Sequence, residues 1–173
     1  LLAALNDIDI LAADVGNAYL NAPTKERVYT TAGPEFGPEL QGRLIIIVRA
    51  LYGLKSSGAA WRAHLANTLH TMGFTSSLAD PDVWFRAAVK PDGFKYYEYV
   101  LAYVYVILAL SHDPKRILST LSNLYRLKDG YDKPTRYLGA QVKEWRFPDD
   151  AARPKWSLSS EQYIKEAIRN VER

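Results

Sequence analysis

The stretch from Tyr96 to Leu110 restricts the possible folds of this chain more than any other segment. It is rich in Tyr, Val, Ile and Leu, and Glu98 is its only charged residue. Such residues favour extended backbone, so the segment Phe94 to Ser111 predicts two strands folded against each other. A run of this kind is an aggregation hazard if it is exposed. The longest apolar run, Tyr99 to Leu110, is shorter than the about 20 residues that a membrane-spanning helix needs.

Other segments carry weaker strand and loop signals. Gly33 to Gly42 holds two prolines and three glycines, which predicts a loop. The remaining strand candidates are rich in β-branched or alternating apolar residues. They are Ile8 to Asp14, Val28 to Thr31, Arg43 to Leu51, Asp82 to Val89, Arg136 to Arg146 and Lys155 to Leu158.

Three segments repeat apolar residues at the spacing of one helix face. The first starts near Ser56 and ends at Gly73, the second starts at Pro114, and the third follows Ser159, which predicts a capping box with Gln162. Their apolar faces are Trp61, Leu65, Leu69 and Met72; Ile117, Leu118, Leu121, Leu124 and Tyr125; and Tyr163, Ile164, Ala167, Ile168 and Val171. Because strands and helices mix without strict alternation, we expect the α+β class, an antiparallel sheet backed by helices.

Composition excludes some kinds of site. The chain has 173 residues, enough for one domain, and its net charge of +3 with a pI of about 9.0 suits a polyanionic partner without requiring one. It has no cysteine, which excludes disulfides and thiolate zinc sites. His64, His70 and His112 are too scattered to predict a metal cluster. No secretory signal is visible, so we expect an intracellular protein of the cytoplasm or nucleus, and the start at Leu1 without Met indicates a fragment.

The first string with possible chemistry runs from Asp14 to Leu20. An acid at the tip of a buried strand can present its carboxylate to Mg²⁺, which prefers oxygen ligands. Gly16 lets the backbone approach a bulky ligand, and backbone N–H groups of the following turn can face a triphosphate. Tyr19 adds a flat ring beside such a ligand. A purely structural role for a strand that ends in Asp remains open.

The second string runs from Ala50 to Lys55 and leads into Ser56-Ser57-Gly58 and Trp61. A strand, a glycine turn, a lysine and a helix start bring cationic and N–H donors together, which favours phosphate. A plain strand-to-helix connection with a solvated Lys55 is the alternative.

The order of these strings resembles the reverse transcriptase domain of Ty1/copia-type retrotransposons. That family has Asp-Val at a strand end, then Ala-(Phe/Tyr)-Leu-Asn, Val-Tyr, Leu-Tyr-Gly-Leu-Lys and Ala-Trp. The same strings stand here as Asp14-Val15, Ala18 to Asn21, Val28-Tyr29, Leu51 to Lys55 and Ala60-Trp61. Later strings of the family match Gly73-Phe74, Tyr137-Leu138-Gly139 and Gln162-Tyr163-Ile164. Each string is weak alone, but the ordered set covers nearly the whole chain.

The resemblance implies part of an RNA-directed DNA polymerase, which joins nucleotides to a DNA 3′ end on a template-primer with Mg²⁺ or Mn²⁺. It divides the chain into a fingers-proximal part (about 20–80), a palm (81–158) and the start of a thumb connection (159–173). It further implies a role for single residues. Asp14 binds metal with help from the Val15 carbonyl; Gly16, Asn17 and Ala18 meet the phosphates; Tyr19 rejects a 2′-hydroxyl; Tyr52 and Gly53 lie against nucleotide and template; and Lys128 assists the leaving pyrophosphate.

One departure from the family decides the expected activity. The family's Tyr-Val-Asp-Asp turn, which supplies two metal-binding acids, stands here as Tyr103-Val104-Tyr105-Val106. Valine has no side-chain oxygen, and a phenol with a pKa near 10 is a poor Mg²⁺ ligand at neutral pH. Two ions about 3.5–4 Å apart need more than one carboxylate, so we expect metal binding at Asp14 to be doubtful and the chain to be inactive.

Several alternatives follow from that departure. Glu98 across the hairpin, or Asp113 further along the chain, is a candidate substitute acid, although Asp113 is distant if the segment is extended. The chain is otherwise a non-catalytic nucleic-acid-binding module, or a decayed remnant of a retroelement without a role. Tyr105 and Val106 also lack the residue types that favour a tight turn, which are Gly, Asn and Asp.

Overall fold

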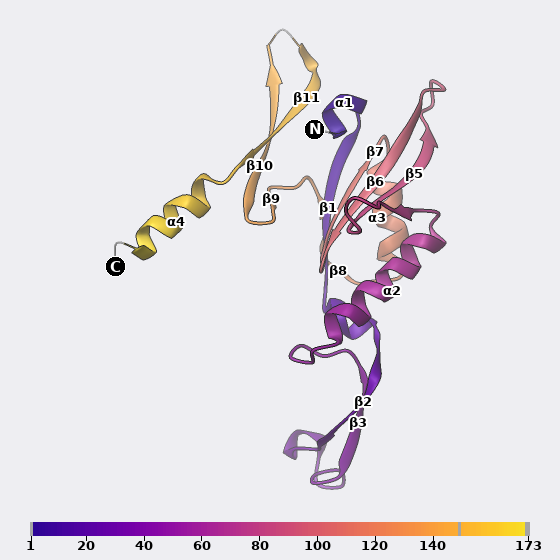
Figure 1. Ribbon diagram of the computed structural model, residues 1–173, viewed down its shortest axis with the longest axis vertical. Coiled ribbons are helices and arrows are strands. Elements are labelled where there is room, and N and C mark those ends of the chain that lie inside the picture. The colour runs from indigo at the N-terminus through magenta and orange to yellow at the C-terminus, as the bar shows by residue number, and fades with distance from the viewer. Residues whose placement is uncertain (1, 149, 172–173) are drawn as a thin grey trace.

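The computed structural model describes residues 2–148 and 150–171. Its centre is a six-stranded antiparallel sheet with the order β4-β5-β6-β7-β1-β8 (Figure 1). The strands are β1 (Asp9–Val15), β4 (Thr75–Ser76), β5 (Val83–Val89), β6 (Lys95–Tyr103), β7 (Val106–Ser111) and β8 (Leu127–Asp132). The expected α+β class is confirmed, and the charge-poor run becomes two neighbouring strands in the interior of the sheet.

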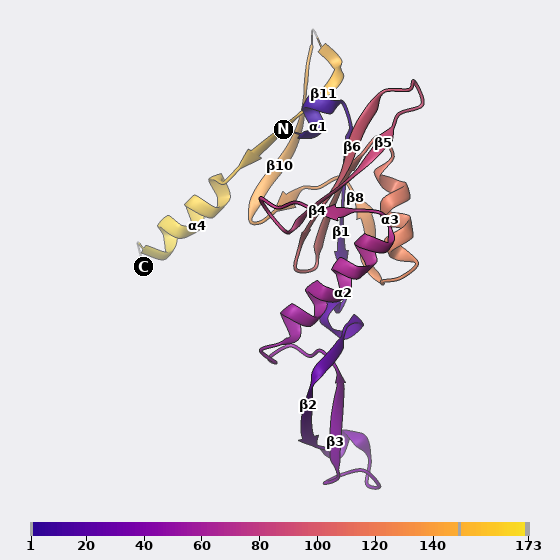
Figure 2. The same cartoon turned by 45° about the vertical axis from the view of Figure 1, so that its right-hand side comes forward.

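Helices α2 (Ser57–Thr71) and α3 (Pro114–Ser122) cover one face of this sheet (Figure 2). Trp61, Leu65 and Leu69 of α2 are buried in the same cluster as Ile117, Leu118 and Leu121 of α3, against Val100, Ala102, Ile107 and Ala109 of the central strands. Two of the three expected helix faces are thereby confirmed in their main positions. Leu124 is the exception, because α3 ends before it and its side chain is exposed.

A second, smaller core lies near the N-terminal end of β1. Helix α1 (Leu2–Asn6) contributes Ala3, and Leu108 and Leu110 come from β7. Trp156 packs against it from a three-stranded sheet with the order β11-β10-β9. The strands of that sheet are β9 (Arg136–Tyr137), β10 (Ala140–Phe147) and β11 (Asp150–Ser159).

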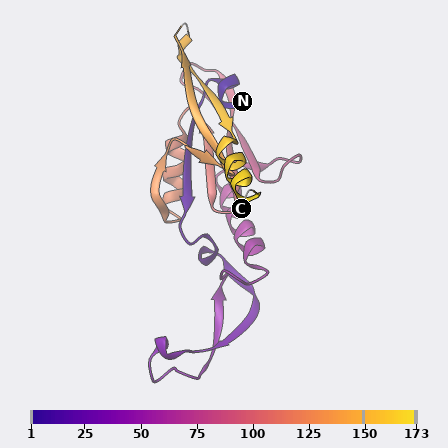
Figure 3. The ribbon, with the colours of Figure 1, turned by 90° about the vertical axis from the view of Figure 1, so that its left-hand side faces the viewer.

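Two segments project from the central sheet (Figure 1), and the first of them also extends away from it in Figure 3. One is the antiparallel ribbon of β2 (Pro23–Thr31) and β3 (Leu44–Arg49), whose connection includes the short 3₁₀ turn η2 (Pro34–Phe36). The other is the C-terminal helix α4 (Glu161–Val171), whose residues are all exposed. Within residues 2–148 and 150–171, no helix is long and apolar enough to cross a membrane.

Two local expectations were wrong. The expected strand Arg136 to Arg146 is interrupted by a turn, in which Leu138 and Gly139 adopt φ values of 49° and 81°. The expected capping box also does not form as predicted: the Ser159 hydroxyl accepts the Glu161 N–H, but the Gln162 side chain accepts from Arg136. A hydrogen bond from Arg136, which is distant in sequence, therefore takes the place of the expected contact between the Gln162 side chain and the Ser159 backbone.

Candidate active site at the β6–β7 turn

The β6–β7 hairpin closes through a two-residue turn. Tyr103 pairs with Val106, which leaves Val104 and Tyr105 in the turn. Val104 has a φ of 52°, in the left-handed region that suits Gly or Asn. For a β-branched residue this conformation costs about 1–3 kcal/mol, and such strain persists only where surrounding contacts fix it.

The turn lies beside Asp14. In the antiparallel ladder of β1 and β7, Asp14 is the direct partner of Val106. On the other side of β1, Asp14 is the direct partner of Lys128 in β8. The structure therefore places Asp14 beside the turn at which the resemblance implies two further acids, and it adds Lys128 to the group.

Asp129 is a neighbour of Asp14 that the sequence did not indicate. The β1–β8 register shifts between Ala13 and Asp14, so Asp129 and Gly130 are extra residues with φ values of 58° and 78°. The pKa of Asp14 is raised because burial disfavours its charged form. The positive charge of Lys128 lowers this pKa, and the negative charge of Asp129 raises it further.

We expect Asp14→Asn to stabilise the fold at neutral pH. A carboxyl group with a raised pKa in the folded state binds its proton more tightly there, so the stability of the wild type falls as the pH rises above the ordinary value of 3.8. The melting temperature of the variant should exceed that of the wild type at pH 7, and the gap should narrow toward pH 4. Asp9→Asn, at the exposed start of the same strand, is the control. A less stable Asp14→Asn variant at pH 7 would contradict this expectation.

The segment after β1 bends back toward α2. Gly16 donates its N–H to the Arg126 carbonyl at 2.9 Å, and a Cβ at this position would lie 3.3 Å from that oxygen. Asn17 is left-handed (φ 50°), and the buried Ala18 opens the 3₁₀ turn η1 (Ala18–Asn21). The backbone N–H of Gly16 is thus used within the fold.

Tyr19 brings this segment to the second predicted string. Its ring lies 4.6 Å from the ring of Tyr52, measured between centroids, and its hydroxyl lies near Gly58 at the start of α2. Gly53 has a φ of 97°, which a residue with a side chain rarely adopts, and Lys55 is exposed. The exposed face of Tyr52 and the cationic Lys55 therefore lie on the same short connection.

Neither suggested substitute acid reaches Asp14. Glu98 is bound by Arg86, Arg116 and the Ser111 hydroxyl. Ser111 pairs with Asp9, at the far end of β1 from Asp14. Asp113 caps α3 at that same end by accepting the Arg116 N–H. Neither acid is therefore placed to replace the missing pair, because the sheet register separates both from the turn.

The side chains at the turn do not fit two metal ions. Tyr105 and Val106 supply no carboxylate, and Lys128 competes with a cation for Asp14. Among the residues that the structure describes, no group of three His, Cys, Asp or Glu side chains could hold a metal ion. Two divalent ions need several oxygen ligands at about 2.0–2.1 Å for Mg²⁺. The side chains described here therefore do not supply the ligands that a pair of Mg²⁺ ions requires.

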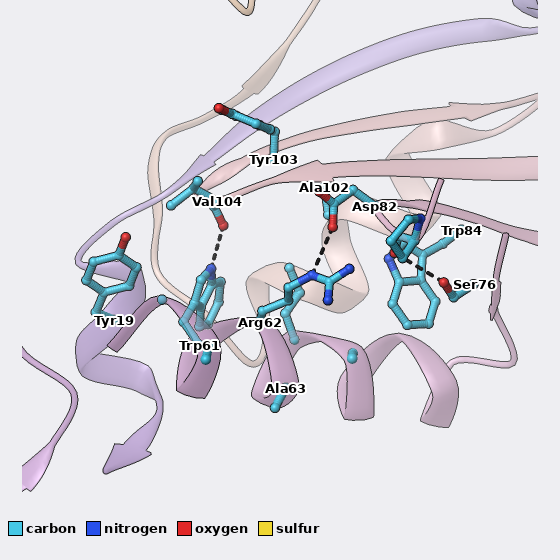
Figure 4. Close-up of a pocket in the computed structure, with 15 residues that line it drawn as sticks. Tyr19, Trp61, Arg62, Ala63, Ser76, Asp82, Trp84, Ala102, Tyr103 and Val104 are labelled. Atoms are coloured by element: carbon cyan, nitrogen blue, oxygen red, sulfur yellow. Dashed lines mark hydrogen bonds and ion pairs between the residues drawn. The ribbon is translucent and has the colours of Figure 1, made fainter. Parts of the chain in front are cut away.

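A cavity of about 530 Å³ opens on the helix side of the turn (Figure 4). Residues of α2 from Gly58 to Ala66 form one wall, and Trp84 and Ala102 form the opposite one. Arg62 and Asp82 form an ion pair of 3.0 Å at this cavity. Tyr19, Tyr103 and Val104 also line it, so the cavity connects both predicted strings with the turn.

Comparisons with known proteins agree with this arrangement. A family model described as reverse transcriptase (RNA-dependent DNA polymerase) matches residues 1–168. The Retrovirus-related Pol polyprotein from transposon RE1 of Arabidopsis thaliana is 34% identical over 75% of this chain and 9% of its own length. A putative transposon Ty5-1 protein of Saccharomyces cerevisiae is 28% identical over 92% of this chain and 49% of its own length. The chain thus spans half or less of the length of these relatives.

No solved structure matches the chain significantly. The Transposon Ty1-BL Gag-Pol polyprotein of Saccharomyces cerevisiae is 42% identical over 35% of this chain. Because the family model matches nearly all of the 173 residues, the chain belongs to the reverse transcriptase (RNA-dependent DNA polymerase) family.

Proposed function

We propose that this chain is a reverse transcriptase palm that has lost nucleotide transfer and keeps only the ability to hold nucleic acid. The observation that carries the proposal is the pairing of Asp14 with Val106. Phosphoryl transfer in polymerases depends on positioning and on metal charge, and two ions clamp the attacking and leaving oxygens. With valine and tyrosine at the turn, Asp14 faces no second acid across the β1–β7 ladder.

The surface around the turn supports retained binding. Exposed Tyr52 offers a ring on which a base can stack, and Lys55 follows three residues later. The net charge of +3 favours a polyanion. The relatives are named as transposon Pol polyproteins, which agrees with a template-primer as the ligand. The predicted division into a fingers-proximal part (20–80), a palm (81–158) and the start of a thumb connection (159–173) is part of this proposal.

Primer extension on an RNA template, with Mg²⁺ or Mn²⁺ and deoxynucleotides, tests the loss of activity. We expect the wild type to produce no more product than the Asp14→Asn variant, since the remaining acid supports no transfer. Product from the wild type clearly above that of Asp14→Asn would overturn the proposal. Asp14→Asn is a matched control because it removes the carboxylate that pairs with Val106 at nearly constant volume.

The same samples test the retained binding by fluorescence anisotropy of a labelled template-primer. The logarithm of the affinity should fall linearly with the logarithm of the salt concentration. Each phosphate contact should add about 0.7–0.9 to the magnitude of that slope. The double variant Tyr52→Ala/Lys55→Ala should bind more weakly than the wild type, whereas Lys165→Ala on the distant α4 serves as the control. If the wild type binds no template-primer even at low salt, the alternative that the chain is a decayed retroelement remnant without a role is the one that remains.

A further inference from the structure

Two hydrogen bonds to its backbone hold the β6–β7 turn. The Trp61 indole N–H on α2 donates to the carbonyl of Val104, as Figure 4 shows. The Val15 N–H, at the end of β1, donates to the carbonyl of Tyr105 at 2.8 Å. Both residues of the two-residue turn are therefore tied through their carbonyls, one to the helix layer and one to the strand that carries Asp14.

Trp61 is itself rigidly placed. Its side chain is 1% exposed and belongs to the main core cluster. The edge of Tyr125 meets its ring at a centroid distance of 5.2 Å and an angle of 77°. The Tyr125 hydroxyl is in turn hydrogen-bonded to the Thr68 hydroxyl, about two turns further along α2. The indole N–H thus extends from the buried, well-packed face of α2 toward the turn.

Nothing in the turn's own side chains explains its conformation. Tyr103, Val104 and Tyr105 are all exposed, so burial of their side chains does not fix the turn. Val104 adopts the left-handed conformation although its side chain disfavours it. The contacts that outweigh this preference are those to the backbone, which do not depend on the side chains at positions 105 and 106.

We infer that Trp61 is a positioning residue that fixes the turn beside Asp14 independently of the residues in the turn. The inference deepens the proposed function and rests on it. Two acidic side chains of the family's metal site are replaced, but the backbone that carries positions 105 and 106 is still held beside Asp14. The double substitution Tyr105→Asp/Val106→Asp should then suffice to restore a divalent-cation site, and that site should depend on the Trp61 N–H.

Titration with Mn²⁺ alone, followed by electron paramagnetic resonance of the free ion, tests the inference without any need for activity. We expect the double variant to bind Mn²⁺ at least about tenfold more tightly than the wild type, because it gains two carboxylates beside Asp14. In that background, Trp61→Phe should weaken binding at least about threefold, the typical loss for one net hydrogen bond.

Trp84→Phe is the matched control in the same background. Trp84 is also a buried tryptophan between α2 and the sheet, but it lies away from the turn. Both Trp→Phe variants should lower the melting temperature similarly, whereas only Trp61→Phe should change Mn²⁺ affinity. Equal losses of affinity in the two variants, or no gain of affinity in the double variant, would overturn the inference.

A subtler variant covers the case in which Trp61→Phe does not fold. Trp61→benzothienylalanine replaces the indole N–H by sulfur at nearly constant shape, so it removes the donor and keeps the packing. It should lower Mn²⁺ affinity as Trp61→Phe does, and unchanged affinity would overturn the inference. Tight binding of two Mn²⁺ ions by the wild type would instead defeat the proposed function, while the comparison of the Trp61 and Trp84 variants still decides the role of Trp61.

Discussion

Glu98→Ala should lower the free energy of unfolding by about 3–5 kcal/mol at pH 7, since it removes one partner of a buried ion pair. The Glu98 side chain is 1% exposed, and its carboxylate accepts from Arg86 Nε at 2.6 Å. The Ser111 hydroxyl donates to it at 2.6 Å and Arg116 Nη2 at 3.1 Å. One carboxylate thus joins β5, β6 and β7 to the start of α3, and its loss leaves Arg86, which is 23% exposed, without an anion.

The effect of Glu98→Ala should depend on pH in a defined direction. Burial raises the pKa of Glu98, but hydrogen bonds from Ser111 and Arg86 and the charges of Arg86 and Arg116 outweigh it, so the pKa is lower than the ordinary value of 4.5. A lowered pKa means that Glu98 contributes stability above about pH 4.5, and that this contribution is lost as the pH falls through the folded-state pKa. The gap between wild type and variant should therefore be largest near neutral pH.

Urea unfolding of wild type and Glu98→Ala at pH 7 and at successively lower pH measures both effects. Glu161→Ala is the control, because Glu161 is exposed and pairs with Lys165 in the next turn of α4. We expect no measurable change from this control. A Glu98→Ala variant as stable as the wild type at pH 7 would show that the network around Glu98 adds nothing to stability.

The elements with the strongest periodicity were predictable from the sequence. Trp61, Leu65 and Leu69 recur at helical spacing and form the buried face of α2. The strand that carries Asp14 and the paired strands β6 and β7 were also expected, since each is a nearly continuous apolar run. In these segments the local preference and the tertiary environment agree, which is why sequence patterns sufficed.

Strand β8 was missed because its sequence contradicts its structure. Leu127 to Asp132 reads Leu-Lys-Asp-Gly-Tyr-Asp, which is polar and contains glycine, so it favours a turn. Its pairing with β1 supplies the hydrogen bonds, and the register shift accommodates Asp129 and Gly130. For the same reason the positions of Lys128 and Asp129 beside Asp14 depend on a register that local preferences do not determine.

The position of the turn between β6 and β7 could not be predicted, for the opposite reason. Val104 and Tyr105 favour a strand, yet they form the turn because Trp61 and Val15 bind their carbonyls. The folded hairpin also changes where an aggregation risk lies. Both β6 and β7 are interior strands with a neighbour on each side, so the apolar run from Tyr96 to Leu110 offers no free edge.

The exposed apolar surface lies instead on the β2–β3 ribbon, which projects from the central sheet (Figure 3). Tyr29 pairs with Ile46 on one of its faces, and Leu44 and Val48 extend that face. Leu44 is 71% exposed and Val48 is 64% exposed. A ribbon with two strands has open edges on both sides, so this apolar face should cause the isolated chain to self-associate as its concentration rises.

Ile46→Lys/Val48→Lys should keep the chain monomeric at concentrations where the wild type associates. Burying one such side chain contributes roughly 1.5–3 kcal/mol, so losing two should weaken self-association more than about tenfold. Sedimentation across a wide range of concentrations measures this. Thr30→Lys/Gln41→Lys adds the same charge outside that face, and it should associate as the wild type does. A wild type that stays monomeric throughout, or a control that dissociates equally, would show that the face formed by Tyr29, Leu44, Ile46 and Val48 does not drive association.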